Sequence, residues 1–140
     1  MKNFLIYYLP VYLLTYIAVA FIIPTYRTWK KTGVNPITFG KADTAHNYIG
    51  FVMKILIALL FVLVISFSLG KQGYAYLIPI PYLEITWVMI VGLGIIHAAL
   101  VWVIIAQYQM STSWRIGIDE ANKTELVTKG IFSISRNPIF

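Results

Sequence analysis

The carboxyl-terminal stretch of the chain carries its most specific arrangement of polar and basic residues. Residues 126–132 read LVTKGIF and, after three further residues, 136–140 read RNPIF. Asn137 is a favourable helix N-cap, and Pro138 suits the first helical position because no backbone N–H is needed there. Arg136 can keep its stem in lipid and its guanidinium in water. The pattern predicts that a further membrane helix starts at Asn137, so we expect the chain to be an incomplete copy of a longer protein.

Two interpretations of this stretch follow from residue chemistry. A helix N-terminus presents free N–H groups and the positive end of its dipole, and Arg136 adds a planar fork that matches a carboxylate. Apolar side chains upstream can form a wall for an aromatic ring; they are Leu126, Val127, Ile131 and Phe132. The pattern therefore fits an anion-binding site with a hydrophobic wall. It also fits an ordinary helix start with an arginine that sets membrane topology.

The same stretch resembles the signature of the isoprenylcysteine carboxyl methyltransferase family and its phospholipid N-methyltransferase relatives. That signature runs approximately L-V-T-x-G-x-Y-x-x-x-R-H-P-x-Y. The spacing is the same, with Phe132, Asn137 and Phe140 at the Tyr, His and Tyr positions. Asn137 keeps a side chain that can form hydrogen bonds, whereas the two Phe residues lack the hydroxyl.

The resemblance implies S-adenosylmethionine as the cofactor, and its methionine carboxylate is a group that Arg136 can bind. It implies no specific catalytic residue in this chain. The positions assigned to the cofactor are Thr124, Glu125, Leu126, Val127, Phe132, Arg136, Asn137, Pro138, Ile139 and Phe140. In the family, a helical hairpin after the R-x-P motif and a later acidic segment complete the sites. We therefore expect the 140-residue chain to bind the cofactor weakly or not at all and to be inactive alone.

Composition indicates a membrane protein. The chain is 59% hydrophobic and 11% charged, with a mean hydropathy of +0.77, whereas soluble domains carry about 25% charged residues. The net charge of +6 does not indicate nucleic acid, because the basic residues flank apolar stretches, where they set topology and meet anionic lipid. The absence of cysteine excludes disulfides and thiolate ligands. We expect no metal site, since the two histidines are far apart and no HExxH pattern occurs.

Hydropathy predicts an all-α integral membrane protein that forms a single membrane domain over residues 1–140. Three apolar stretches are long enough to cross about 30 Å of hydrocarbon as helices. The expected spans are residues 4–23, 49–69 and 85–106. A cytoplasmic segment at 107–136 then leads into the start of a truncated fourth helix at 137–140.

The connecting segments predict the orientation of the spans. Residues 25–48 form a polar loop rich in Arg and Lys, whereas the connection at 70–84 contains Lys71 as its basic residue. The positive-inside rule then places the N-terminus outside and the two basic segments, 25–48 and 107–136, in the cytoplasm. A bacterial plasma membrane is the expected location. Within the second basic segment, Trp114, Ile116 and Ile118 alternate with other residues, which predicts a short strand or an interfacial stretch.

The two histidines are further candidates. His97 lies within the third apolar stretch, where an ionisable residue is costly and therefore a functional candidate. The interpretation that we favour is a neutral histidine bonded to a neighbouring helix, with Gly94 and Ala98 forming a close helix contact. His46, three residues after Asp43, fits either an acid–base pair at a lipid headgroup or a pair of solvated loop residues.

The leading functional prediction is S-adenosylmethionine-dependent methyl transfer to a lipophilic acceptor in the lipid bilayer, such as the carboxylate of a prenylated cysteine or a related lipid. Basic residues between Arg27 and Lys41 can attract an anionic headgroup or carboxylate, although topology also explains them. Two alternatives remain. One is a membrane reductase-like protein with a nicotinamide cofactor, since membrane sterol reductases resemble these methyltransferases in their C-terminal half. The other is a non-catalytic small membrane protein.

Overall fold

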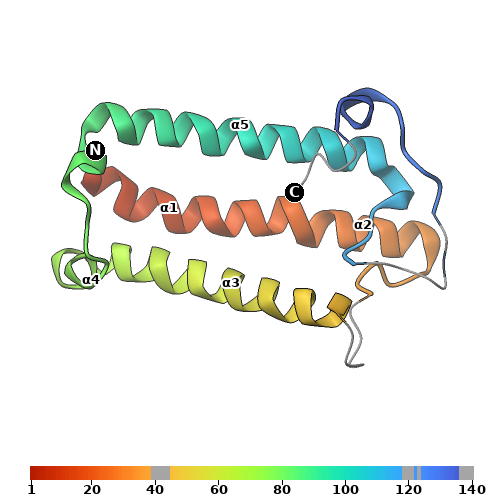
Figure 1. Ribbon diagram of the computed structural model, residues 1–140, viewed down its shortest axis with the longest axis horizontal. Helices are drawn as coiled ribbons and strands as arrows, with labels where there is room; N and C mark the ends of the chain where they lie inside the picture. The colour runs from red at the N-terminus through yellow and green to blue at the C-terminus, as the bar shows by residue number, and fades with distance from the viewer. Residues whose placement is uncertain (39–44, 118–121, 123, 136–140) are drawn as a thin grey trace.

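Three long apolar helices lie side by side in the computed structural model, with the amino-terminal helix in the middle (Figure 1). The structure describes residues 1–38, 45–117, 122 and 124–135. Its elements are α1 (Lys2–Ile17), the π-helix η1 (Ala18–Ile22), α2 (Ile23–Thr32), α3 (Ala45–Ser68), α4 (Lys71–Tyr76), the 3₁₀ turn η2 (Pro81–Glu84), α5 (Thr86–Met110) and the 3₁₀ turns η3 (Ser111–Ser113) and η4 (Gly130–Ser133). The predicted all-α class with three helices able to span a membrane is confirmed.

The amino-terminal helix is longer than expected. The elements α1, η1 and α2 form one helical rod of 31 residues, from Lys2 to Thr32, whereas hydropathy predicted a span ending at residue 23 and then a loop. The loop prediction is wrong for residues 25–32, which are helical. The change from apolar to polar residues marks the place where a helix leaves the hydrocarbon of a membrane, and a helix can continue beyond that place. The rod ends at Gly33, whose φ of +69° forms a left-handed cap and whose N–H donates to the carbonyl of Trp29 at 2.8 Å.

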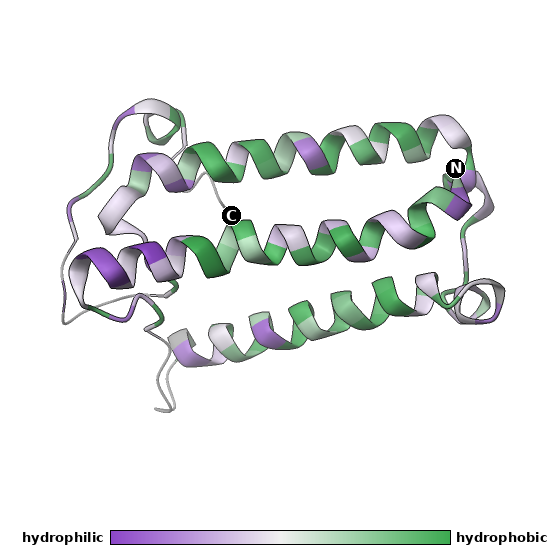
Figure 2. Cartoon of the chain, turned by 180° about the vertical axis from the view of Figure 1, so that it is seen from behind, coloured by the Kyte–Doolittle hydropathy of each residue, from purple (hydrophilic) through white to green (hydrophobic). Residues whose placement is uncertain are grey.

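The second and third spans lie where hydropathy placed them. The helix α3 begins four residues earlier than the predicted start at 49, and α5 extends four residues beyond the predicted end at 106. The connection between them is itself partly helical, since it contains α4 and η2. Large apolar side chains are exposed on each of the three long helices, with more of them on α3 and α5 than on α1, and hydrophobic colour predominates along the helices in the view of Figure 2. Exposed apolar helix surfaces suit a lipid environment.

A proline inside α1 is accommodated by a side chain from α3. Pro10 has no N–H and cannot bond to the carbonyl of Ile6, four residues earlier. The hydroxyl of Ser68, at the end of α3, donates to that carbonyl at 2.8 Å. In a membrane, a neighbouring serine commonly satisfies a carbonyl freed by proline. The bond also fixes how α3 packs against α1.

Three residues hold together the end of the bundle where the chain starts. The Nζ atom of Lys2 lies 2.8 Å from Glu84 Oε2 and 5.1 Å from the centre of the Tyr74 ring. The Tyr74 hydroxyl donates to the other oxygen of Glu84. These bonds lower the pKa of Glu84, Lys2 contributing most and Tyr74 next. The pKa of Tyr74 is raised, chiefly because its hydroxyl donates to Glu84.

The opposite end, here called the basic end, contains a small core. Thr28, on α2, and Trp114, after η3, expose 2% and 4% of their surface, and Pro36 is fully buried. The backbone of Ile116 pairs with the chain that follows α2, donating to Pro36 at 2.8 Å and accepting from Thr38 at 3.0 Å. The pairing is an isolated bridge between Ile37 and Ile116. The predicted short strand does not form in the described residues, and Ile118 lies outside them. The bridge joins the segments that leave α2 and α5.

Candidate functional site

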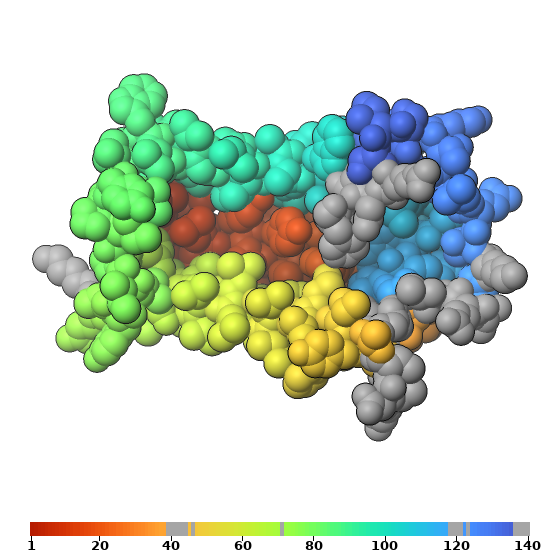
Figure 3. Space-filling view, viewed as in Figure 1, coloured from red at the N-terminus to blue at the C-terminus, as the bar shows by residue number. Residues whose placement is uncertain are grey.

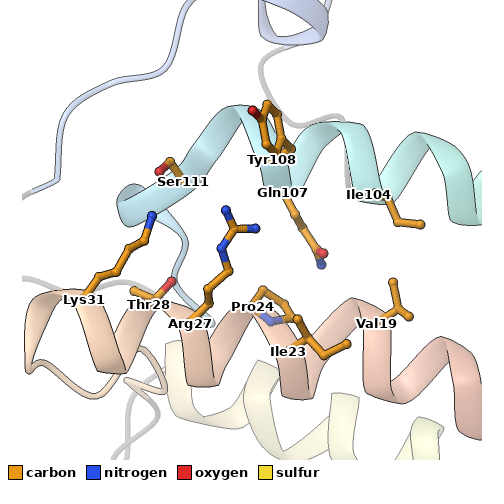
Figure 4. A pocket seen from close by; sticks show the side chains of 10 residues that line it. All are labelled: Val19, Ile23, Pro24, Arg27, Thr28, Lys31, Ile104, Gln107, Tyr108 and Ser111. Atoms are coloured by element: carbon orange, nitrogen blue, oxygen red, sulfur yellow. The ribbon is translucent and has the colours of Figure 1, made fainter.

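A groove lies at the basic end, between α2 and the last turns of α5 (Figure 4). Its volume is about 130 Å³. The residues that line it are Val19, Ile23, Pro24, Arg27, Thr28, Lys31, Ile104, Gln107, Tyr108 and Ser111. The apolar members lie toward the middle of the helices and the polar and charged members toward their ends, so the groove has a hydrophobic part and a cationic part.

The cationic part comes from two residues on α2. Arg27 and Lys31 are four residues apart, which places them on the same face of a helix. Both side chains are exposed and extend from α2 toward the end of α5, near Tyr108 and Ser111 (Figure 4). The helical extension of the rod past residue 23 creates this arrangement, because in a loop the same spacing would not align the two side chains.

One side-chain bond fixes the distance between α2 and α5. Pro24 has no N–H and cannot bond to the carbonyl of Ala20, four residues earlier. The amide of Gln107, on α5, donates to that carbonyl at 2.6 Å. Ala20 lies in the π-helix η1, and Pro24 is at the start of α2. The bond therefore holds the segment that carries Arg27 beside the helix that forms the other wall.

The groove is electrostatically unbalanced. None of its lining residues is acidic, and neither Arg27 nor Lys31 has an ion-pair partner among the residues that the structure describes. Among the described residues, the salt bridge joins Lys2 and Glu84, at the end of the bundle opposite the groove. Two positive groups on the side of the groove that Ser111 also lines form a donor-rich site. Such a site can bind a phosphate or a carboxylate.

The segment predicted to hold the cofactor docks on another part of α5. The N–H of Ile131 donates to Oε1 of Gln109 at 2.9 Å, and η4 packs against α5. Gly130 has a φ of +67°, and a Cβ there would lie 2.4 Å from the Gln109 amide. A larger residue would be strained and would displace the side chain that accepts from Ile131. Gly130 is therefore required by the geometry of this docking.

The predicted cofactor residues are only partly brought together. Thr124, Glu125 and Leu126 lie in an irregular stretch and are exposed, Leu126 by 87%. Val127 and Phe132 are half-buried, and none of these five lines the groove. The remaining predictions, Arg136, Asn137, Pro138, Ile139 and Phe140, and the helix start expected there, lie outside the described residues.

His97 bonds to the neighbouring helix. Its Nδ1 lies 2.7 Å from the carbonyl of Leu93, and its Nε2 forms a hydrogen bond with the hydroxyl of Tyr8 on α1. Since a carbonyl only accepts, Nδ1 donates, and in the neutral ring Nε2 accepts from Tyr8. Tyr12 donates to the carbonyl of Ile96 at 2.6 Å beside it. The preferred interpretation, a histidine bonded across helices, agrees with this geometry.

The close contact expected at Gly94 and Ala98 is absent from the described structure. No heavy atom lies within 4 Å of a Cβ built on Gly94, and both residues are exposed. The side of α5 that faces α1 is instead the one that carries His97. The expectation at His46 depends on Asp43, which lies outside the described residues.

Sequence reasoning missed Gln107 and did not place Arg27 and Lys31 in a site. Gln107 was taken as the first polar residue after a span, and its partner is the backbone of Ala20, which leaves no pattern in the sequence. The four-residue spacing of Arg27 and Lys31 was available, but it has meaning only on a helix. A helix prediction through Thr32 would have found the pair.

These features define the class of the protein as a helical, multi-pass membrane protein whose basic end holds a cationic groove. Family models, curated proteins and solved structures each gave no match to the chain when they were searched.

Proposed function

We propose that the protein is an S-adenosylmethionine-dependent methyltransferase of the membrane, acting on a lipophilic acceptor with an anionic group. The observation that carries the proposal is the spacing of residues 126–132 and 136–140, which matches the methyltransferase signature described above. Gly130, the glycine of that signature, has a conformation in this chain that a larger residue would strain. This conformation supports the proposal that the segment resembles the signature in local structure as well as in sequence.

The burial of the described residues supports this assignment for part of the cofactor. Leu126 is exposed and Val127 and Phe132 are half-buried, so all three apolar side chains are accessible to a planar base. The cation proposed for the methionine carboxylate is Arg136, assigned on sequence alone. S-adenosylmethionine supplies an electrophilic methyl group on a sulfonium, and an acceptor oxygen or nitrogen displaces the thioether as it takes the methyl. The task of the protein in such a displacement is to align the two partners and to exclude water.

The proposed orientation puts the basic end in the cytoplasm and the N-terminus outside, because Arg27, Lys30 and Lys31 concentrate at that end. A bacterial plasma membrane is the proposed location. A polar cofactor would then reach residues 124–140 from the cytoplasm. A lipophilic acceptor would approach laterally, through the bilayer, toward the same end of the bundle.

Titration calorimetry of the purified protein in detergent tests the proposal. Binding of S-adenosylmethionine is the result expected of a methyltransferase. Arg136→Ala should weaken that binding, whereas Lys129→Ala, which removes a nearby charge outside the assigned positions, should not. Binding of a nicotinamide nucleotide instead would favour the reductase alternative. Binding of neither cofactor would favour a non-catalytic membrane protein.

A further inference from the structure

We propose that the groove between α2 and α5 is a binding site for an anionic phospholipid, with its phosphate at Arg27 and Lys31 and an acyl chain along Val19, Ile23 and Ile104. This inference rests on the groove alone. It does not depend on the methyltransferase proposal, because the residues assigned to the cofactor that the structure describes, 124–127 and 132, do not line the groove.

The position of the groove across the thickness of the bilayer indicates that its ligand is a lipid. The rod from Lys2 to Thr32 has 31 residues and is about 46 Å long at about 1.5 Å per residue. The hydrocarbon core of a bilayer is about 30 Å thick, and about 40–45 Å with its headgroups. A rod of this length that crosses the bilayer would have both its ends in headgroup layers. Arg27 and Lys31 are within its last turns, which would place them at the depth of lipid phosphates.

The two parts of the groove match the two parts of a phospholipid. Arg27 and Lys31 converge on one space and have no acidic partner among the described residues, so a phosphate would complete their charge. Ser111 adds a hydroxyl on the facing wall, whereas the hydroxyl of Tyr108 points away from α2 (Figure 4). Val19, Ile23 and Ile104 continue the groove toward the middle of the bundle. A free phosphate has no apolar part that could contact these residues, whereas the acyl chain of a phospholipid does.

The groove is held open independently of any ligand. Gln107 ties α5 to the carbonyl of Ala20 at 2.6 Å, and the buried side chains of Thr28 and Trp114 support the end of α2. A site whose walls are already positioned loses less entropy when its ligand binds. The space-filling view shows the amino-terminal rod recessed between α5 and α3 (Figure 3).

Native mass spectrometry of the detergent-solubilised protein tests the site. The probes are phosphatidylglycerol and phosphatidylcholine with identical chains. We expect one phosphatidylglycerol to be retained in preference to phosphatidylcholine. Arg27→Gln and Lys31→Gln should each lower its retention about fivefold, the effect of one cation near a lipid surface. Lys30→Gln is the matched control: it removes the same charge from the same helix, but Lys30 does not line the groove, and retention should stay unchanged.

Three results would overturn the inference. Equal retention of the two lipids would remove the charge selectivity. Equal losses in Lys30→Gln and Arg27→Gln would show diffuse attraction to a basic surface. Competition by soluble glycerol phosphate as effective as that by phosphatidylglycerol would show that the site binds a free phosphate and that the apolar part contributes nothing. Circular dichroism of each variant confirms that the helices are intact before retention is compared.

Discussion

The side-chain amide of Gln107 donates to the carbonyl of Ala20 at 2.6 Å, the backbone oxygen that Pro24 cannot reach. Ser68 does the same for Ile6, opposite Pro10, at 2.8 Å. For each proline in the amino-terminal rod, the carbonyl four residues earlier thus accepts a hydrogen bond from a polar side chain on another helix. In this protein a proline inside an apolar helix marks the place where a second helix docks.

The first prediction concerns the coupling of Gln107 to Pro24. Gln107→Leu removes the interhelical bond and should lower the free energy of unfolding by about 0.6 kcal/mol, and by about 1.7 kcal/mol at most, as for other hydrogen bonds in membranes. Pro24→Ala restores a backbone N–H at position 24, which can bond to the Ala20 carbonyl. In the Pro24→Ala variant, Gln107→Leu should therefore lower the free energy of unfolding by less than it does in the native protein. Unfolding in mixed detergent micelles measures all four members of the cycle, and equal costs in both backgrounds would contradict the coupling.

The second prediction concerns Gly130. Gly130→Ala should release η4 from α5, because alanine at a positive φ costs about 1–2 kcal/mol and its Cβ would displace Gln109. Amide hydrogen exchange should then rise at Ile131, whose N–H donates to Gln109. Gly92→Ala is the control, since a Cβ on Gly92 meets open space within α5. Unchanged protection of Ile131 in Gly130→Ala would show that the docking does not need the glycine.

The third prediction is a pH dependence at the end of the bundle that contains Lys2. The pKa of Glu84 is lowered in the folded protein, first by Lys2 and then by Tyr74. The stabilisation by its carboxylate is therefore complete above the unfolded pKa, about 4.3, and is lost as the pH falls through the lower folded pKa. The stability difference between the native protein and Glu84→Gln should be constant above about pH 5 and shrink below about pH 4, on either side of that value. Glu125→Gln, which removes an exposed carboxylate far from Lys2 in the sequence, should not reproduce this profile.

The fourth prediction concerns the tautomer of His97. Because Nδ1 lies 2.7 Å from the carbonyl of Leu93, the neutral ring should carry its proton on Nδ1 and accept from Tyr8 through Nε2. Nitrogen-15 chemical shifts of labelled histidine distinguish the two tautomers directly. Tyr8→Phe should shift the Nε2 resonance, whereas Tyr16→Phe should not, because no hydrogen bond joins Tyr16 to His97 in the described structure. A proton on Nε2 would contradict the assigned geometry.

The sequence predicted the existence and type of the long helices because each contains an apolar stretch long enough to cross a membrane. It misplaced the end of the first one, since the change from apolar to polar after Ile23 was read as the end of the helix. The true end is set by the left-handed cap at Gly33. A glycine followed by a polar, proline-containing stretch was visible, but it was interpreted as part of a loop that had already started.

The candidate groove could not be predicted from the sequence, for a different reason. It depends on tertiary contacts between side chains and backbone, such as Gln107 with Ala20, and a backbone carbonyl has no identity in the sequence. The carboxyl-terminal segment was identified from its spacing, yet its attachment through Gln109 and Gly130 depends on the position of α5. Its remaining positions, from Arg136 onward, stay predictions.

The central position of α1 has a consequence for biogenesis. Helices enter a membrane in the order of their synthesis and then associate laterally. The helix α1 is synthesised before α3 and α5. It contacts α3 through Ser68 and α5 through Tyr8 and Tyr12, and it lies between them (Figure 1). Each later helix therefore finds its docking surface already in the bilayer when it leaves the translocation machinery, and neither has to wait for a partner that the ribosome has yet to produce.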